Sequence, residues 1–210
     1  MEKVRCYIVG AGEFDESTLP LSDDFVIAAD GGFVYLHERG IEPDLIVGDF
    51  DSLPAEFMDA VNRHPNVTRV SAEKDDTDML LAVKEGLKRG FKSFAINGCL
   101  GGKLDQTYAN IQILTFITDN AATGVLYGNS SCVTAVTDSS LELNPSNSKG
   151  KAISIFSAEK QARGVTLSGL RYPLTDAVIT NYYPGVSNEF TEELARMSVS
   201  NGTLIIIWEK

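Results

Sequence analysis

The chain has 210 residues, enough for one large domain or two modest ones. Its 43% hydrophobic and 22% charged residues are typical of a globular protein, and no apolar run approaches the roughly 18 residues that a membrane span needs. Lys and Arg total 18 against 29 Asp and Glu, and the formal net charge of -11 disfavours a nucleic-acid partner. A small anionic ligand such as a nucleotide could still bind if a divalent cation stood between its phosphates and the carboxylates.

The N-terminal sequence MEKVRCYIVGAG predicts the entry to a strand and lacks the long apolar stretch and cleavage site of a signal peptide, so we interpret the protein as cytoplasmic. Cys6, Cys99 and Cys132 are far apart and odd in number. We therefore expect small buried residues and no disulfide framework or metal site. The two histidines, His37 and His64, lie in helix-like surface segments, and we expect neither to be a ligand.

Up to about residue 128, short apolar runs alternate with helical patterns, which predicts a parallel sheet with helices on its faces. The runs are CYIVGAG, FVIAA, LIV, VTRV and SFAIN. The clearest helix is expected over residues 75–90, with acids in its first turn and with one apolar face formed by Leu80, Val83 and Leu87. A second is expected from near Asp105, with one apolar stripe formed by Tyr108, Ile111 and Leu114.

After about residue 130, short apolar runs are separated by Ser, Asn, Gly and Pro clusters, which is typical of an antiparallel β-sandwich or barrel. Trp208 in the run LIIIW is expected to pack within a strand. We place the boundary near Gly128 to Ser131, giving domains of residues 1–128 and 129–210. The second domain, of about 80 residues, is small enough that packing on the first domain or on another subunit would help it.

Acidic residues follow three of the predicted strands at their carboxyl ends. Asp30 follows FVIAA, Asp49 and Asp51 follow LIV, and Asp75, Asp76 and Asp78 come soon after VTRV. Parallel strands send such turns to one edge of the sheet, where ligands bind in open α/β folds. Each motif alone has a structural explanation, as a turn or as a helix cap. Together, however, the carboxylates would repel one another unless a hard cation such as Mg²⁺ neutralised them.

The stretch GCLGGKLDQ, residues 98–106, follows the predicted strand SFAIN. Its glycines allow the backbone to approach a ligand, the start of a helix comes next, and Lys103 adds a positive charge, all of which favours a phosphate. It is not a Walker A loop, because Leu104 stands where Ser or Thr is required. VGAG near the N-terminus is only a weak signal for dinucleotide binding.

The order and spacing of these motifs resemble the thiamine pyrophosphokinase family, also called thiamine diphosphokinase, over nearly the whole chain. The matching stretches are ADGG at 29–32, PDLIVGDFDS at 43–52, EKDDTD at 73–78, GGKLDQ at 101–106, GLRYPL at 169–174 and the Ser-Asn of GVSNEF at 185–190. The resemblance implies a Rossmann-like α/β domain, a C-terminal β-sandwich, and a homodimer with active sites at the subunit interface. It also implies a diphosphotransferase that moves the β,γ-pyrophosphoryl group of ATP to the hydroxyethyl oxygen of thiamine, releasing AMP and thiamine diphosphate.

Matched motif by motif, the resemblance implies roles for individual residues. The magnesium ligands would be Asp30, Asp49, Asp51 and Asp78. The ATP-binding residues would be Asp30, Gly31, Asp49, Asp75 and Lys103. The thiamine-binding residues would be Asp105, Gln106, Ser187, Asn188 and Phe190. Catalysis would depend on Asp78, Lys103 and Asp105, with Asp78 and Asp105 both candidates to accept the proton of the thiamine hydroxyl.

The sequence departs from the family pattern at two positions and leaves other interpretations open. Position 103 is Lys where many members have Arg, and Phe190 stands where some have a larger aromatic and could instead be a core side chain. LIVGDFDSL also resembles the nucleophile motif of haloacid dehalogenase-type phosphatases, with Asp49 as nucleophile, although Ser52 replaces the usual Thr or Val. A non-catalytic nucleotide sensor, with the sandwich binding a partner, is the other alternative.

Overall fold

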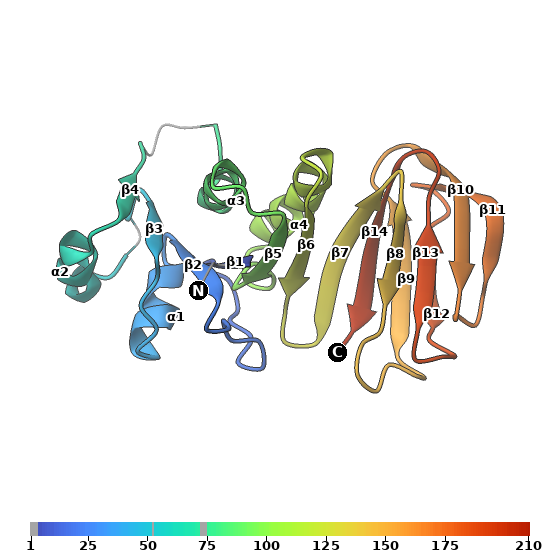
Figure 1. Ribbon diagram of the computed structural model, residues 1–210, viewed down its shortest axis with the longest axis horizontal. Coiled ribbons are helices and arrows are strands. Elements are labelled where there is room, and N and C mark those ends of the chain that lie inside the picture. The colour runs from blue at the N-terminus through green and yellow to red at the C-terminus, as the bar shows by residue number, and fades with distance from the viewer. Residues whose placement is uncertain (1–3, 52, 72–74) are drawn as a thin grey trace. The chain divides into compact units, whose positions relative to one another are not determined.

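The structure is a computed structural model that describes residues 4–51, 53–71 and 75–210 (Figure 1). Ser52 and the first two residues of EKDDTD, Glu73 and Lys74, lie outside the described residues. The chain forms two compact units: unit 1 is Met1–Ile113 with Leu126–Asn129, and unit 2 is Leu114–Val125 with Ser130–Lys210. Residues 114–125, which the sequence analysis assigned to the first domain, group with unit 2 in this division.

Unit 1 contains a parallel sheet, as the alternation of apolar runs predicts. Its strands pair in the order β5-β1-β2-β3-β4. The strands are β1 (Arg5–Val9), β2 (Asp24–Ala29), β3 (Leu45–Gly48), β4 (Val67–Arg69) and β5 (Ser93–Asn97), and β6 (Thr123–Tyr127) lies where the division between the units falls. Each pair is parallel, with Ile8 opposite Ile27 on one side and Ile96 on the other. All carboxyl ends of these strands therefore lie at one edge.

Helices lie on both faces of this sheet. They are α1 (Gly32–Glu38), α2 (Ala55–Arg63), α3 (Asp78–Lys88) and α4 (Leu104–Asp119). The fourth, α4, begins in unit 1 and crosses the division between the units. Figure 1 shows α1 and α3 on opposite faces of the sheet. Tyr7 and Val9 belong to the core cluster that includes Phe33 and Leu36 of α1. Cys6, which alternates with them, faces α3, where a Cβ on Gly86 would lie 3.0 Å from its Sγ.

The helix α3 begins three residues later than predicted and buries a different stripe. Thr77 is its N-cap, because its side chain accepts a hydrogen bond from the Leu80 amide at 3.2 Å. The expectation that Asp75 and Asp78 could be the caps is therefore wrong. The predicted face through Leu80, Val83 and Leu87 is correct only at Val83, since Leu80 and Leu87 are half-buried. The other buried residues are Met79, Ala82 and Gly86.

The helix α4 starts where predicted, at Leu104, but its predicted apolar stripe is only partly correct. Tyr108 is 62% exposed, whereas Leu114 is buried. The buried residues of this helix are Asn110, Ile113, Leu114 and Ile117. The buried stripe thus includes a polar residue, Asn110, which a search for apolar periodicity passes over.

Unit 2 is built from antiparallel strands, which confirms the predicted β-sandwich. One set pairs in the order β12-β9-β14-β7 and the other in the order β11-β10-β13-β8. The strands are β7 (Ser131–Thr137), β8 (Ser140–Leu143), β9 (Ala152–Ser157), β10 (Gln161–Ser168), β11 (Leu174–Thr180), β12 (Gly185–Glu189), β13 (Ala195–Ser198) and β14 (Thr203–Glu209). Trp208 is buried in β14 between Cys132 of β7 and Ile153 of β9, so its predicted role in strand packing is confirmed.

The cysteines are buried, and the histidines make contacts within the protein. Cys6, Cys99 and Cys132 are buried free thiols, as expected. His37 stacks on Phe33, with ring centroids 5.4 Å apart. The ring nitrogens of His64 lie 2.8 and 2.9 Å from backbone carbonyl oxygens. In the described part of the chain, no helix has the length and apolar character needed to cross a membrane.

A buried ion pair stabilises the start of the sheet and gives a first prediction. Arg5 donates two hydrogen bonds to the carboxylate of Asp24, at 2.9 and 2.7 Å, and Asp24 is 1% exposed. Asp24→Asn should lower the free energy of unfolding by about 2–3 kcal/mol, because it weakens charge-assisted bonds at a buried site. Urea denaturation measures this. Asp59→Asn, at the exposed Arg63–Asp59 pair, is the control and should cost at most about 0.5 kcal/mol; equal costs would contradict the prediction.

Candidate functional site

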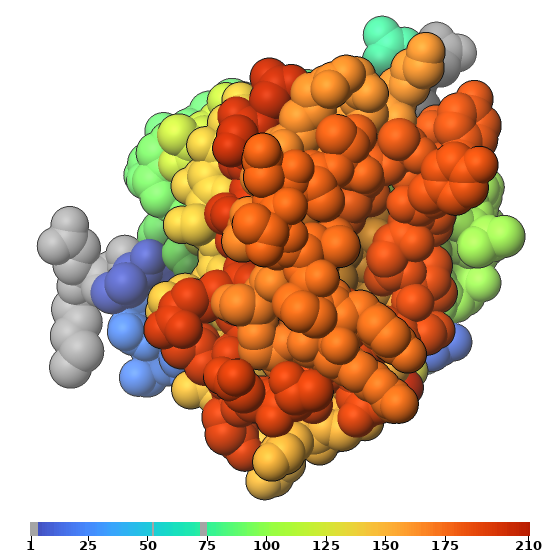
Figure 2. Space-filling view, turned by 90° about the vertical axis from the view of Figure 1, so that its right-hand side faces the viewer, coloured from blue at the N-terminus to red at the C-terminus, as the bar shows by residue number. Residues whose placement is uncertain are grey.

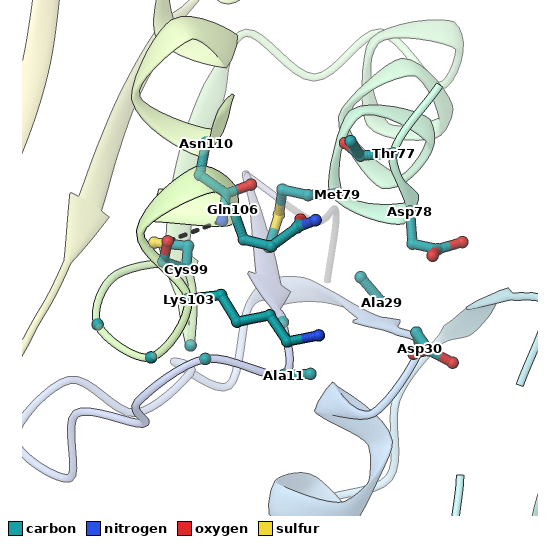
Figure 3. Close-up of a pocket in the computed structure, with 15 residues that line it drawn as sticks. Ala11, Ala29, Asp30, Thr77, Asp78, Met79, Cys99, Lys103, Gln106 and Asn110 are labelled. Carbon is teal, nitrogen blue, oxygen red and sulfur yellow. Dashed lines mark hydrogen bonds between the residues drawn. The ribbon is translucent and has the colours of Figure 1, made fainter. Parts of the chain in front are cut away.

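A cavity of about 510 Å³ lies in unit 1, where the carboxyl ends of β1, β2 and β5 meet the first turns of α3 and α4. Its walls include backbone from Gly10 to Gly12 and from Gly98 to Gly102. The polar side chains that line it come from remote parts of the sequence and include Asp30, Asp78, Lys103 and Gln106 (Figure 3). The prediction that the strand-to-helix turns meet at one edge is confirmed for these segments.

The charged groups in the cavity have opposite signs and share one space. Figure 3 shows the side chain of Lys103 extending from the turn after β5 toward the side of the cavity where Asp30 and Asp78 lie. Both aspartates are half-buried, while Lys103 is exposed. A cation beside carboxylates suits a ligand that carries negative charge together with a bound metal ion.

Glycines form one wall of the cavity because two backbone segments approach closely there. The Gly10 amide donates to the carbonyl oxygen of Asn97 at 2.9 Å, and the Gly12 amide donates to that of Gly98 at 2.7 Å. A Cβ on Gly98 would lie 2.3 Å from the Gly10 oxygen, and Gly98 has a φ of +62°. The glycines of the VGAG motif therefore allow this loop to pack closely on the turn after β5. The weak dinucleotide signal did not predict this role.

The loop that carries Asp49 and Asp51 begins beside Asp30. A Cβ on Gly48 would lie 3.0 Å from the Cα of Asp30. Asp30 and Phe50 both have a positive φ, 47° and 62°, which is unfavourable for non-glycine residues by about 1–3 kcal/mol. Phe50 is buried, and the guanidinium of Arg69 lies 5.1 Å from its ring centroid. Such strain is concentrated where the backbone is held to position functional side chains.

Other predicted residues of unit 1 do not line the cavity. Asp49, Asp51 and Asp75 lie outside its lining, and Gly31 lies beside Ala11 of the cavity wall. Asp105 is exposed in the first turn of α4, where its carboxylate accepts a hydrogen bond from the Gln106 amide at 2.9 Å.

Within the described ranges, no group of three or more His, Cys, Asp or Glu side chains could hold a metal ion. The four-aspartate magnesium site thus stays a prediction. Asp30 and Asp78 are the carboxylates that the cavity itself provides. Magnesium usually binds through one or two carboxylates and completes its shell with waters and phosphate oxygens, so this donor set fits the ion.

The predicted thiamine-binding residues of unit 2 lie in and directly after β12. Ser187 is exposed and has a φ of 57°. The amide of Asn188 binds the backbone of Tyr172, accepting from its N–H and donating to its carbonyl oxygen, both at 2.9 Å. Phe190 is 0% exposed, which is the position expected of a core side chain. Its role in stacking on thiamine stays a prediction.

The structure also shows cavity residues that the sequence analysis missed. Asn110 lines the cavity, and its Nδ2 donates to the carbonyl oxygen of Cys99 at 2.7 Å (Figure 3). Its position four residues after Gln106 places both on one face of α4, a spacing that could have indicated it. Met79 lines the cavity beside Asp78, and its Cε would be 2.5 Å from a Cβ on Gly10.

Unit 1 is thus an α/β fold with a glycine-walled cavity at the carboxyl edge of its parallel sheet, the position and lining that suit a phosphate-bearing ligand. Comparison with models of protein families identifies the family to which the chain belongs. The model of the thiamin pyrophosphokinase catalytic domain matches residues 18–125, and the model of the thiamin pyrophosphokinase vitamin B1 binding domain matches residues 139–204. The chain belongs to the thiamin pyrophosphokinase family.

Individual relatives agree with this assignment. The chain is 29% identical to thiamine pyrophosphokinase of Bacillus subtilis (strain 168) over 198 residues, which cover 93% of this chain and 89% of the relative. The crystal structure of the Bacillus subtilis thiamine pyrophosphokinase has a TM-score of 0.85 at 25% identity, covering 98% of this chain and 99% of that one. A thiamin pyrophosphokinase family protein from Enterococcus faecalis has a TM-score of 0.85 at 26% identity, with the same coverage of both chains. These comparisons support neither the phosphatase alternative nor the nucleotide-sensor alternative.

Proposed function

We propose that the protein is a thiamine diphosphokinase, a transferase that moves the pyrophosphoryl group of ATP to the hydroxyethyl oxygen of thiamine and releases AMP. Membership in the family supports this proposal for both parts of the chain. The observation that carries it is the convergence of Asp30, Asp78 and Lys103 on one glycine-walled cavity. Carboxylates for a metal ion and a cation for phosphate are what pyrophosphoryl transfer needs, because it depends on positioning and charge stabilisation.

We place the triphosphate of ATP in this cavity. Asp30 and Asp78 would hold Mg²⁺, with Asp49 and Asp51 approaching directly or through water from the loop after β3. When bound, the ion supplies positive charge against the phosphates. Lys103 adds a second positive charge that faces the phosphates, and the turn before α4 lets backbone amides approach phosphate oxygens. Gly31 and Asp75 border the same nucleotide region in this proposal.

The thiamine hydroxyl would attack in line from the side of Gln106. Of the two candidates to accept its proton, Asp78 lines the cavity, whereas Asp105 is exposed and outside the lining. Their positions favour Asp78, because a proton acceptor must come within hydrogen-bond reach of the hydroxyl. Asp105 would then support the first turn of α4, where its carboxylate accepts a hydrogen bond from the backbone N–H of Gln106 at 2.9 Å.

We further propose a cytoplasmic homodimer in which the exposed Ser187 of one subunit contacts thiamine beside the cavity of the other, while the buried Asn188 and Phe190 support this segment from behind. Support for a subunit contact comes from unit 2, where large apolar side chains are at least half exposed. They are Tyr172, Val178, Tyr182, Tyr183 and Val186. Figure 2 shows the face of unit 2 that includes β10 and β11, in orange. These exposed apolar side chains are the candidates in unit 2 for burial in a subunit contact. The buried free thiols are compatible with a reducing compartment.

An assay of products tests the proposed reaction. Enzyme mixed with ATP, MgCl₂ and thiamine should form AMP and thiamine diphosphate in equal amounts, as measured by chromatography. Omitting thiamine should abolish AMP formation, because the hydroxyl is the acceptor, and EDTA should also abolish it. ADP or inorganic phosphate as the main product would reject pyrophosphoryl transfer.

A further inference from the structure

Asn97, the last residue of β5, lies behind the glycine wall of the cavity and is 0% exposed. Its Oδ1 accepts hydrogen bonds from the amides of Asp15 and Gly98, at 2.9 and 2.7 Å. Its Nδ2 lies 2.9 Å from the carbonyl oxygens of both Asp15 and Thr18, and 3.0 Å from the hydroxyl of Tyr7. Donors thus face the side-chain oxygen and acceptors face the nitrogen.

This arrangement fits a carboxamide and no other common side chain of the same size. An aspartate would bring a carboxylate oxygen against the carbonyl oxygens of Asp15 and Thr18. A leucine would leave the buried amides and carbonyls of both segments without these partners, which is unfavourable in the interior. Hydrogen bonding, and not the filling of apolar volume, therefore determines that position 97 is asparagine.

The two segments that Asn97 joins are the two that form the glycine wall. Asp15 and Thr18 belong to the loop that begins with Gly10 in the cavity, and Gly98 begins the turn that leads to Lys103. Backbone hydrogen bonds hold these segments together next to the cavity, from Gly10 and from Gly12. The carboxamide of Asn97 holds them together further from the cavity.

Tyr7 supports the same junction. Its hydroxyl donates to the carbonyl oxygen of Thr18 at 2.5 Å. Burial raises the pKa of Tyr7 to about 12, partly offset by the hydrogen bond from Asn97, so the hydroxyl keeps its proton at neutral pH. The hydrogen bonds that Asn97 and Tyr7 make to the loop are therefore between neutral groups.

We propose that Asn97 is a positioning residue for the nucleotide: its carboxamide sets the spacing between the loop of residues 10–18 and the turn of residues 98–103, and so fixes the wall against which the triphosphate lies. The proposal rests on the function proposed above. Asn97 does not line the cavity, so its effect reaches the ligand only through the two backbone segments. A displaced wall would no longer contact the triphosphate at the right distance, so the loss should appear in the affinity for ATP.

The test compares the effect of a substitution on KM with its effect on kcat, and the KM for ATP with the KM for thiamine. Asn97→Leu and Asn97→Asp should raise the KM for ATP and the Kd of Mg·ATP, measured by calorimetry, about 10-fold or more, while the KM for thiamine changes less than about 2-fold. A merely structural role would lower the fraction of active enzyme, and therefore kcat, with both KM values unchanged. That result, or an equal rise in both KM values, would overturn the proposal.

Two further variants keep the test decisive. Thr134→Val is the matched control, because it removes a buried side-chain hydrogen bond to the Gly124 carbonyl oxygen at 2.7 Å in unit 2, and it should leave the KM for ATP unchanged. If neither Asn97 variant folds by circular dichroism, Tyr7→Phe takes their place. It removes only the hydroxyl that contacts Asn97 and Thr18, and it should weaken Mg·ATP binding by about 3-fold; unchanged binding would then reject the proposal. If the wild type binds Mg·ATP but forms no AMP, the proposed function fails while the binding comparison still decides the role of Asn97.

Discussion

Replacing Asp78 with asparagine is expected to lower the kcat/KM of pyrophosphoryl transfer about 100-fold or more while the protein stays folded. Asp78 is the first residue of α3 and lines the cavity. Asparagine has the same size but removes the negative charge that faces a bound cation. The helix should persist, because its N-cap is the neighbouring Thr77 and not Asp78. Initial rates of AMP formation at increasing Mg²⁺ measure the effect, and the Mg²⁺ concentration for half-maximal rate should also rise.

The same motif provides a matched control. Asp76 lies two residues earlier and forms an ion pair with Lys84 at 2.6 Å, and it does not line the cavity. Asp76→Asn makes the same chemical change in the same segment, and its rate should stay within about 2-fold of the wild type, since a partly exposed ion pair contributes little. If Asp78→Asn kept the wild-type rate and Mg²⁺ dependence, the carboxylate would have no role in the reaction. If both variants lost activity equally, the loss would reflect the segment and not the charge at the cavity.

The convergence of Asp30, Asp78 and Lys103 could be predicted from the sequence because it depends on topology alone. Alternating apolar runs and helical patterns indicate parallel strands, and parallel strands put their carboxyl ends at one edge. No knowledge of side-chain packing is needed for that step. The antiparallel character of unit 2 was predictable for a similar reason, since short apolar runs separated by turn residues indicate hairpins.

The N-cap of α3 and the buried stripe of α4 depend on packing, and the sequence did not predict them. An acidic residue near a helix start is compatible with several caps, and only the hydrogen bond from Leu80 shows that Thr77 is the one used. In α4 the buried stripe includes Asn110, whose amide binds the Cys99 carbonyl. Apolar periodicity cannot identify a stripe that contains a buried polar residue, so Tyr108 was assigned to it although it is exposed.

The backbone geometry around the cavity could not be predicted from the sequence either. Asp30 and Phe50 have positive φ values, although neither is glycine. Aspartate visits this region occasionally, but phenylalanine does so rarely, so the surrounding structure must impose the conformation on Phe50. Phe50 lies between Asp49 and Asp51, so its positive φ sets the course of the loop that carries both carboxylates. Side-chain type alone therefore predicts the donors but not their orientation.

Gly98→Ala is expected to destabilise the protein by roughly 2–5 kcal/mol and to lower the kcat/KM of its folded fraction about 100-fold. Two effects add. The φ of +62° at this position is unfavourable for alanine, and the new Cβ would lie 2.3 Å from the Gly10 carbonyl oxygen. The backbone cannot separate freely, because the Gly12 amide donates to the Gly98 carbonyl oxygen at 2.7 Å. Relief of the overlap must widen the wall on which the triphosphate is proposed to lie.

Gly40→Ala separates the two effects. Gly40 has a φ of +65°, close to that of Gly98, but no atom lies within 4 Å of the position of its Cβ. This variant should therefore show the backbone strain alone, about 1 kcal/mol in urea denaturation, with an unchanged rate of AMP formation. The difference between the two variants measures the crowding between Gly98 and Gly10. Equal destabilisation with equal activity would mean that the overlap at Gly98 does not displace the wall, and this would contradict the role of the wall in holding the nucleotide.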